Sequence, residues 1–214
     1  MITPVSLKCE NLEKRFLSKI IFREINFTLN SGSSIAVTGR NGSGKSTLLK
    51  VVANLIKQSK GKIVLKVTEK EIPEEKRFAH IGMIAPYINL YDELTAFENL
   101  EFFCELKCED KGSKQKPEYI NVLLEKINLY NRRNDVVKNY SSGMKQRLKL
   151  GFAIINEPLI LLMDEPRTNL DSEGIDLVYS VAEAQKSRGI LIIATNEFDD
   201  TRLCAETINV ESHK

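Results

Sequence analysis

The chain has 214 residues, of which 42% are hydrophobic and 28% charged, with a formal net charge of +2. This is the composition of an ordinary folded protein with a sizeable core, and so slight a charge gives no reason to expect a nucleic-acid partner. No run approaches the ~20 apolar residues that cross a bilayer, and the first residues lack the basic and apolar regions of a secretion signal. We therefore expect a cytoplasmic chain that forms no membrane channel by itself.

The first thirty residues alternate between apolar and polar side chains, most clearly over 21–29, which predicts antiparallel strands. Residues 61–67 and 81–85 predict two further strands, the second of them buried and ended by Pro86. From Leu94 to about Ile155 the pattern becomes helical.

Within this helical region, Thr95 and Glu98 have the spacing of a capping box, and the polar stretch 108–117 predicts an exposed loop. The continuous apolar run 159–163 then predicts a parallel strand covered on both faces. A helix over about 173–188 and a strand over 190–194 complete a βαβ unit. Two halves of a nucleotide-binding α/β core thus flank a helical insert.

Cysteines and histidines give no strong signal of a metal site. The four cysteines are expected to be reduced thiols, since no secretion signal precedes them. Cys104 and Cys108 stand four residues apart on an expected helix without further ligands nearby, which favours packing over metal binding. His80 and His213 are expected to be structural or surface residues.

One segment carries a specific chemical prediction: Gly39-Arg40-Asn41-Gly42-Ser43-Gly44-Lys45-Ser46-Thr47. It matches G-x-x-x-x-G-K followed by Ser or Thr, the nucleoside-triphosphate P-loop, and it lies between an apolar run and a helical one. The glycines let the backbone curl so that successive N–H groups point at one phosphate. Lys45 would lie between the β- and γ-phosphates, and the Ser46 hydroxyl would ligate Mg²⁺. The sequence therefore predicts binding of ATP or GTP.

Two adjacent carboxylates, Asp164 and Glu165, end the apolar strand 159–163. A strand end beside a P-loop is where Mg²⁺ needs a carboxylate, and Asp164 is the predicted metal ligand. Glu165 points to the other side of the strand, toward an attacking water, and is the candidate general base. Alternatively, the two carboxylates only keep a loop in contact with water. The P-loop earlier in the sequence makes this alternative less favoured.

Residues 140–147, Tyr-Ser-Ser-Gly-Met-Lys-Gln-Arg, form a small-residue loop at the start of a basic helix, where free N–H groups can bind phosphate. Together with the P-loop and the acidic strand, this segment resembles the ATP-binding cassette (ABC) family, whose signature loop usually reads Leu-Ser-Gly-Gly-Gln. The resemblance covers nearly the whole chain. It implies an α/β fold: a P-loop NTPase core on a RecA-like parallel sheet, an N-terminal antiparallel β region and a helical insert. It also implies one domain, 1–214, with a core lobe (1–85 and 156–214) and a helical lobe (86–155).

The resemblance further implies a dimer with a second ABC ATPase subunit, identical or different, that sandwiches the nucleotide. Ser141 and Gly143 of one subunit would contact the γ-phosphate held by the other. Phe16 would stack on adenine, and Asp171 would lie near the dimer interface.

Two positions depart from the family pattern. Pro86 stands where the family has a Gln, and Asn196 stands where it has a switch His. Asn can hydrogen-bond the γ-phosphate but carries no proton at neutral pH. Since loss of a positioned acid–base group can cost ~10²–10⁴ in rate, we expect slow but real Mg²⁺-dependent ATP hydrolysis. Ser142 and Met144 are milder changes in the signature loop.

The leading hypothesis is the ATPase subunit of an ABC transporter, held at the inner face of the membrane by a separate transmembrane permease. Residues 87–100 resemble exporter-type subunits, which favours export. Tyr87, Leu90 and Tyr91 either anchor the permease or pack inside the helical lobe.

The alternative function is that of a soluble, non-transport ABC ATPase that drives a macromolecular assembly. A P-loop kinase would not need residues 140–147. The sequence does not encode the transported substrate.

Overall fold

A computed structural model describes residues 3–107 and 116–214. Strands β1 (Val5–Phe16) and β2 (Lys19–Asn30) form a long antiparallel hairpin. Strands β4 (Lys60–Val67) and β5 (Lys70–Glu71) extend it into a four-stranded sheet of order β2-β1-β4-β5. From Val5 to Cys9, side chains of β1 alternate between the core and the outer face, and register shifts interrupt the alternation after Cys9. The predicted N-terminal antiparallel region is confirmed.

The second sheet has five strands in the order β6-β7-β8-β3-β9, and its neighbouring strands pair in parallel. Its members are β3 (Ser34–Thr38), β6 (Ile81–Ile84), β7 (Ile160–Asp164), β8 (Ile190–Ala194) and β9 (Glu206–Asn209). Every residue of β7 and β8 is buried. This agrees with the continuous apolar runs, because a parallel strand covered on both faces has no solvent-facing side.

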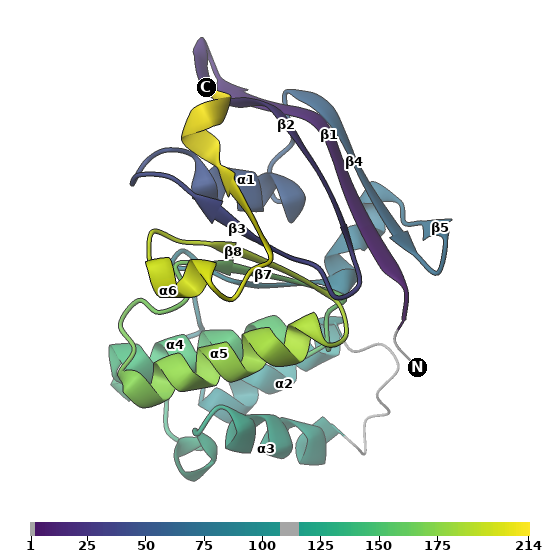
Figure 1. Cartoon of the computed structure of the whole chain (residues 1–214). Helices are drawn as coiled ribbons and strands as arrows, with labels where there is room; N and C mark the ends of the chain where they lie inside the picture. Colours follow the sequence, from purple (N-terminus) through teal and green to yellow (C-terminus); the bar gives the residue numbers. More distant parts are fainter. Residues whose placement is uncertain (1–2, 108–115) are drawn as a thin grey trace.

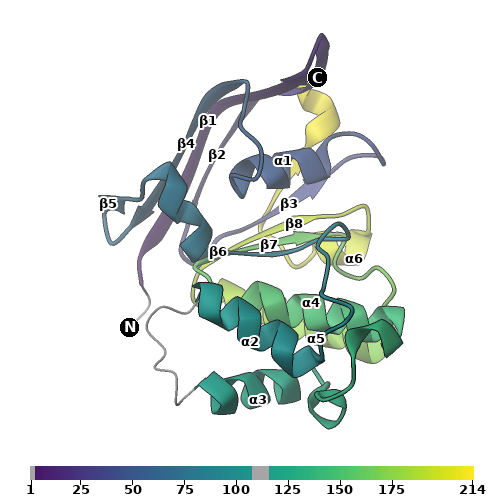
Figure 2. The ribbon, with the colours of Figure 1, turned by 180° about the vertical axis from the view of Figure 1, so that it is seen from behind.

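The helices cover the parallel sheet unequally (Figure 1). Helix α1 (Lys45–Val52) lies between the two sheets. On the other face of the parallel sheet lie α2 (Ala96–Lys107), α3 (Lys116–Lys126), α4 (Ser142–Ile154) and α5 (Ser172–Lys186), as the reverse view in Figure 2 also shows. The remaining short helices are η1 (Glu74–His80), η2 (Tyr130–Arg132), η3 (Val137–Asn139), α6 (Phe198–Thr201) and η4 (Val210–His213).

Two hydrophobic cores therefore form, one on each face of the parallel sheet. In β7, Ile160 and Leu162 pack between the sheets with α1, whereas Leu161 and Met163 pack against the helical layer. The parallel sheet is the middle layer, and the carboxyl ends of its strands share one edge. Among the described residues, no helix is long and apolar enough to cross a membrane.

Of the local predictions for the helical region, the capping box is right and the exposed loop is wrong at its end. The capping box is confirmed, because the Glu98 N–H donates to Thr95 Oγ1 at 3.1 Å and the Thr95 N–H donates to Glu98 Oε2 at 2.7 Å. The loop expected over 108–117 is wrong at its end, since Lys116 and Pro117 begin α3. Proline is tolerated in a first helical turn, where N–H groups lack partners in the helix. The rest of that loop, with Cys108, lies outside the described residues. The boundaries proposed for the two lobes stay predictions.

The helical-side core gives a stability prediction. Leu100 of α2 is fully buried in it, whereas Leu17, in the β1–β2 turn, is 98% exposed. Leu100→Ala should lower the free energy of unfolding by about 2–5 kcal/mol, because it removes buried methyl groups and leaves a cavity. Leu17→Ala should change it by less than about 0.5 kcal/mol. Urea denaturation of both variants checks this, and equal losses would contradict the assigned core.

Candidate functional site

The P-loop connects β3 to α1. Three glycines in it have positive φ angles, namely 138° at Gly39, 77° at Gly42 and 118° at Gly44. Side chains disfavour this left-handed region, so glycine is needed for the curl. Gly44 is also sterically enclosed, since an added Cβ would lie 2.6 Å from Ile21 Cγ2. The hairpin of β1 and β2 therefore packs directly on the loop that leads into α1.

The Lys45 ammonium is the centre of the site. Lys45 is only 5% exposed, and its Nζ donates to Gly39 O at 2.8 Å and to Asn196 Oδ1 at 2.9 Å. Glu165 Oε1 lies 3.4 Å from the same nitrogen. Because a buried ammonium is costly without partners, these contacts hold the side chain across the loop. They join the P-loop to the ends of β7 and β8.

Asn196 bridges two predicted site residues. Its Oδ1 accepts from Lys45, and its Nδ2 donates to Asn41 Oδ1 at 2.6 Å. The structure thus brings Asn41, Lys45, Glu165 and Asn196 together, although the last two follow different strands. The contact with Asn41 has no signal in the local sequence.

Asp164, the last residue of β7, is 1% exposed, and neither of its carboxylate oxygens has a well-formed hydrogen bond among the described residues, although the Ser46 hydroxyl lies close to it. Burial raises the pKa of this carboxyl, while the Ser46 hydroxyl and the Lys45 and Lys50 ammonium groups oppose the shift. An unpaired buried carboxylate is costly, and a cation that prefers oxygen ligands would relieve the cost.

Asp164 and Ser46 therefore offer a fitting pair of oxygen ligands for Mg²⁺. The described residues contain no group of three or more His, Cys, Asp or Glu side chains that could hold a metal ion. A magnesium ion at Asp164 and Ser46 would consequently need further oxygen ligands, which nucleotide phosphates and water supply.

Glu165 has a φ of 47°, in the left-handed region. This conformation costs a non-glycine residue roughly 1–2 kcal/mol, and the Glu165 N–H donates to Ala194 O at 2.8 Å, which ties the residue to the end of β8. Its side chain is partly exposed beside Lys45. The geometry places a carboxylate with access to water at the buried ammonium. Its role as the general base stays a prediction.

The signature segment begins α4. Ser141 is the N-cap, and its Oγ accepts from the Met144 N–H at 3.2 Å. Gly143 lies close to the segment after β7, since an added Cβ would be 3.3 Å from Asn169 O. Arg147 reinforces this contact by donating to both Asp171 oxygens, at 3.0 and 3.2 Å. Contact of Ser141 and Gly143 with a partner's nucleotide stays a prediction, as does the interface role of Asp171.

Phe16 ends β1 and is 50% exposed, with Lys14 Nζ 4.7 Å from its ring centre. The same hairpin packs on the P-loop through Ile21. An exposed aromatic face near the P-loop fits the expected adenine contact, which stays a prediction.

The segment after β6 has Pro86 in place of the expected amide side chain. Lys149 Nζ donates to Pro86 O at 3.1 Å. Tyr87 is 36% exposed and contacts its neighbours: its hydroxyl donates to Met83 Sδ at 3.8 Å, and Lys50 Nζ lies 3.8 Å from its ring centre. Burial and the Asp164 charge raise the pKa of Tyr87.

The three candidate anchors therefore differ. Leu90 packs against the helical core, and Tyr91 is 49% exposed and stacks edge-on with Phe102 at 5.2 Å. Tyr91 is thus better placed than Tyr87 or Leu90 to meet a partner.

The C-terminal segment reaches the P-loop in a way that the sequence analysis missed. Glu211 Oε2 accepts from the Arg40 N–H at 3.2 Å, and Val210 packs beside Gly44. Figure 1 shows this segment beside the turn of the β1–β2 hairpin. No local pattern marks either residue, because their contacts depend on the pairing of β9 with β3 at the edge of the sheet.

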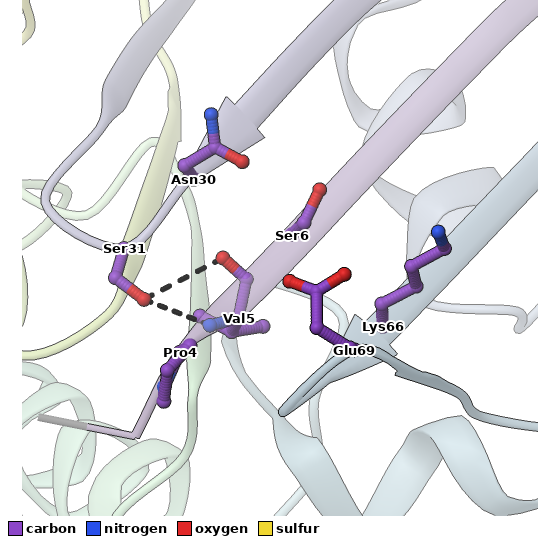
Figure 3. A pocket seen from close by; sticks show the side chains of 7 residues that line it. All are labelled: Pro4, Val5, Ser6, Asn30, Ser31, Lys66 and Glu69. Atoms are coloured by element: carbon purple, nitrogen blue, oxygen red, sulfur yellow. Dashed lines mark hydrogen bonds between the residues drawn. The ribbon is translucent and has the colours of Figure 1, made fainter.

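A cavity of about 330 Å³ lies where β1 begins, away from the P-loop (Figure 3). Ser31 Oγ accepts from the Val5 N–H at 2.8 Å there. None of the predicted site residues lines it, and its lining consists of Pro4, Val5, Ser6, Asn30, Ser31, Lys66 and Glu69.

This arrangement, a P-loop lysine facing the carboxyl ends of two parallel strands, defines a P-loop nucleotide-binding domain. The family model described as "ABC transporter" matches residues 22–168, and the chain belongs to this ABC family as one of its nucleotide-binding domains.

Two curated relatives show the same membership. The ABC transporter ATP-binding protein YdbJ of Bacillus subtilis (strain 168) is 32% identical over 194 residues, which cover 90% of this chain and 61% of YdbJ. The Nod factor export ATP-binding protein I of Rhizobium leguminosarum bv. viciae is 31% identical over 207 residues, covering 95% of this chain and 65% of that protein. The chain thus spans less than two thirds of either relative.

Among solved structures, the dimer of the ATP-binding cassette MJ0796 bound to ADP and Pi has the same fold. Its TM-score is 0.82 at 22% sequence identity, over 95% of this chain and 94% of that one. The expected α/β fold, with its P-loop core and antiparallel region, is confirmed.

The unpaired charge of Asp164 generates a prediction. Without nucleotide and Mg²⁺, Asp164→Asn should melt at a higher temperature than the wild type, because a neutral amide is less costly to bury than a carboxylate. With Mg²⁺ and ATP, the variant should gain less in melting temperature than the wild type. Differential scanning calorimetry measures both. Asp176→Asn, at an exposed helical position, is the control. An Asp164→Asn variant that melts lower than the wild type without ligands would contradict this account of the site.

Proposed function

We propose that the chain is the ATP-binding and ATP-hydrolysing subunit of an ABC transporter, and that it powers a separate transmembrane permease. The observation that carries this proposal is the meeting of three groups at one sheet edge. They are the buried Lys45 ammonium, the unpaired Asp164 carboxylate and the accessible Glu165 carboxylate.

ATP binds with its phosphates along the P-loop, from Gly39 to Thr47. There the backbone N–H groups and the Lys45 ammonium meet the negative charge. Phosphate oxygens replace Glu165 and Asn196 as partners of Lys45, and Phe16 supports the adenine. Ser46 and Asp164 would hold Mg²⁺, which would neutralise charge on the phosphates.

Glu165 accepts the proton of the water that attacks the γ-phosphate. Its carboxylate is suited to this step because it lies beside Lys45 yet keeps access to solvent. Asn196 contributes by orientation, since its amide carries no proton, and hydrolysis is correspondingly slow.

Two subunits close around ATP, and the Ser141 and Gly143 of one meet the γ-phosphate held by the other. The second subunit is either another copy of this chain or a different ABC ATPase. Cleavage removes this bridge, so the subunits separate and the permease changes conformation. The permease holds the chain at the inner face of the membrane. Export is favoured by the name of the Nod factor export relative. The exposed Tyr91 lies on the segment that would face the permease.

The catalytic proposal is tested by ATP turnover of the full chain together with its membrane partner. Glu165→Gln keeps the size of the side chain but removes the base, and turnover should fall by ~10²-fold or more while ATP still binds. Lys45→Ala should weaken ATP binding itself. Equal turnover in the wild type and Glu165→Gln would refute the proposal.

Affinity purification from solubilised native membranes tests the transporter proposal. A stoichiometric multi-span protein should accompany the chain and be lost on Tyr91→Ala. Purification without any membrane protein would instead favour the soluble, non-transport class of ABC ATPase.

The position of Asn196 gives a separate prediction. Asn196→His introduces a ring nitrogen that can exchange a proton near neutral pH, where the wild-type amide contacts Lys45. Turnover should rise by about tenfold, and Asn196→Ala should lower it. Steady-state kinetics at saturating ATP measures both changes. An Asn196→His variant slower than the wild type would show that the amide is not the limiting feature.

A further inference from the structure

One buried carboxylate joins the two loops that carry Glu165 and Asn196. Asp200, on the short helix α6, is 1% exposed, and both of its oxygens accept hydrogen bonds. The Thr195 hydroxyl donates to Oδ2 at 2.8 Å, and the Tyr179 hydroxyl of α5 donates to Oδ1 at 3.1 Å.

Thr195 transmits this contact to Asn196. It is fully buried and directly precedes Asn196, and its Oγ1 also accepts from the Glu197 N–H at 3.0 Å. The Thr195 hydroxyl thus hydrogen-bonds both Asp200 on α6 and the backbone of Glu197, and so links α6 to the turn that contains Asn196. Since Asn196 hydrogen-bonds Lys45 and Asn41, the orientation of this turn determines whether its amide reaches them.

Arg167 connects the same carboxylate to the loop after β7. Its Nη1 lies 3.8 Å from Asp200 Oδ1 and 3.6 Å from Asp199 Oδ2, which are ion-pair distances. Arg167 follows Glu165 by two residues. Together with Glu165 and Asp200, it lines a cavity of about 260 Å³. The contacts therefore run from the Glu165 loop through Arg167 and Asp200 to the Asn196 turn.

Burying a carboxylate is costly, and burial raises the pKa of Asp200. If the residue at position 200 only anchored α6 to the core, an apolar side chain would be sufficient. A charged group that accepts hydrogen bonds from two elements and pairs with a third fixes their relative positions more narrowly.

We propose that Asp200 and Thr195 are positioning residues for ATP hydrolysis, which hold the Asn196 turn and the Glu165 loop at Lys45. The inference rests on the proposed ATPase function. In the part of the chain that the structure describes, the hydrogen bonds and ion pairs of both side chains are with residues outside the P-loop. Thr195 acts through Asn196, whereas Asp200 acts through Asn196 and, by way of Arg167, through the Glu165 loop.

The test compares Thr195→Val, which keeps the shape but loses both hydroxyl hydrogen bonds, with Thr195→Ser, which keeps the hydroxyl. Thr195→Val should lower kcat by on the order of tenfold and leave the dissociation constant of ATP within about twofold. Thr195→Ser should stay within about threefold of the wild-type kcat. Thr201→Val is the matched control, because it removes a hydroxyl bond within α6, from Thr201 Oγ1 to Phe198 O, and should leave kcat unchanged.

A double variant separates positioning from general stability. If the hydroxyl acts through Asn196, Thr195→Val should lower kcat by less than about twofold in an Asn196→Ala background. Tyr179→Phe removes one hydrogen bond to Asp200 from another element. It should lower kcat in the same direction, and it replaces Thr195→Val if that variant does not fold.

Several results would overturn the inference. They are an unchanged kcat in Thr195→Val, an equal loss in Thr195→Ser, or the full loss in the Asn196→Ala background. If the wild type has a higher kcat than Glu165→Gln, but Thr195→Val has the same kcat as the wild type, only this inference is overturned. A wild type no faster than Glu165→Gln would overturn the proposed function as well.

Discussion

The rest of the site depends on the buried ammonium of Lys45. A cation this deeply buried is stable only with acceptors around it, and its acceptors come from the P-loop, the end of β7 and the turn after β8. One charge thus draws together loops that are distant in the sequence. The same contacts hold Glu165 and Asn196 beside Lys45 Nζ, at the positions that phosphate oxygens would occupy when ATP binds.

The parallel sheet makes this convergence possible. β7 and β8 are buried along their whole length, and each ends at the same edge as β3. Polar groups can appear only where the strands stop, and there Asp164, Glu165 and Asn196 occur. The buried, unpaired carboxylate of Asp164 is costly for folding and suited to binding a cation. The two hydrophobic cores on the faces of the sheet offset this free-energy cost.

The sequence predicted the features that repeat or that stand at fixed spacing. The glycines of the P-loop, the apolar strand before Asp164 and the capping box of Thr95 and Glu98 are local patterns with local causes. The contact of Lys45 with Asn196 joins residues 151 positions apart, and it forms only because β3 and β8 pair side by side in the sheet. The beginning of α3 at Lys116 was missed because its polar first turn resembles a loop. The hydrogen bond from Arg40 to Glu211 and the contacts of Asp200 likewise depend on tertiary packing.

When ATP binds, its phosphates should replace Glu165 and Asn196 as the partners of Lys45. A crystal structure of the chain with Mg²⁺ and a non-hydrolysable ATP analogue tests it most directly. We expect Lys45 Nζ in contact with phosphate oxygens, and Mg²⁺ held by the Ser46 hydroxyl and the Asp164 carboxylate. A bound analogue that leaves Lys45 on Asn196 and Glu165, or a metal ion away from Asp164, would contradict it.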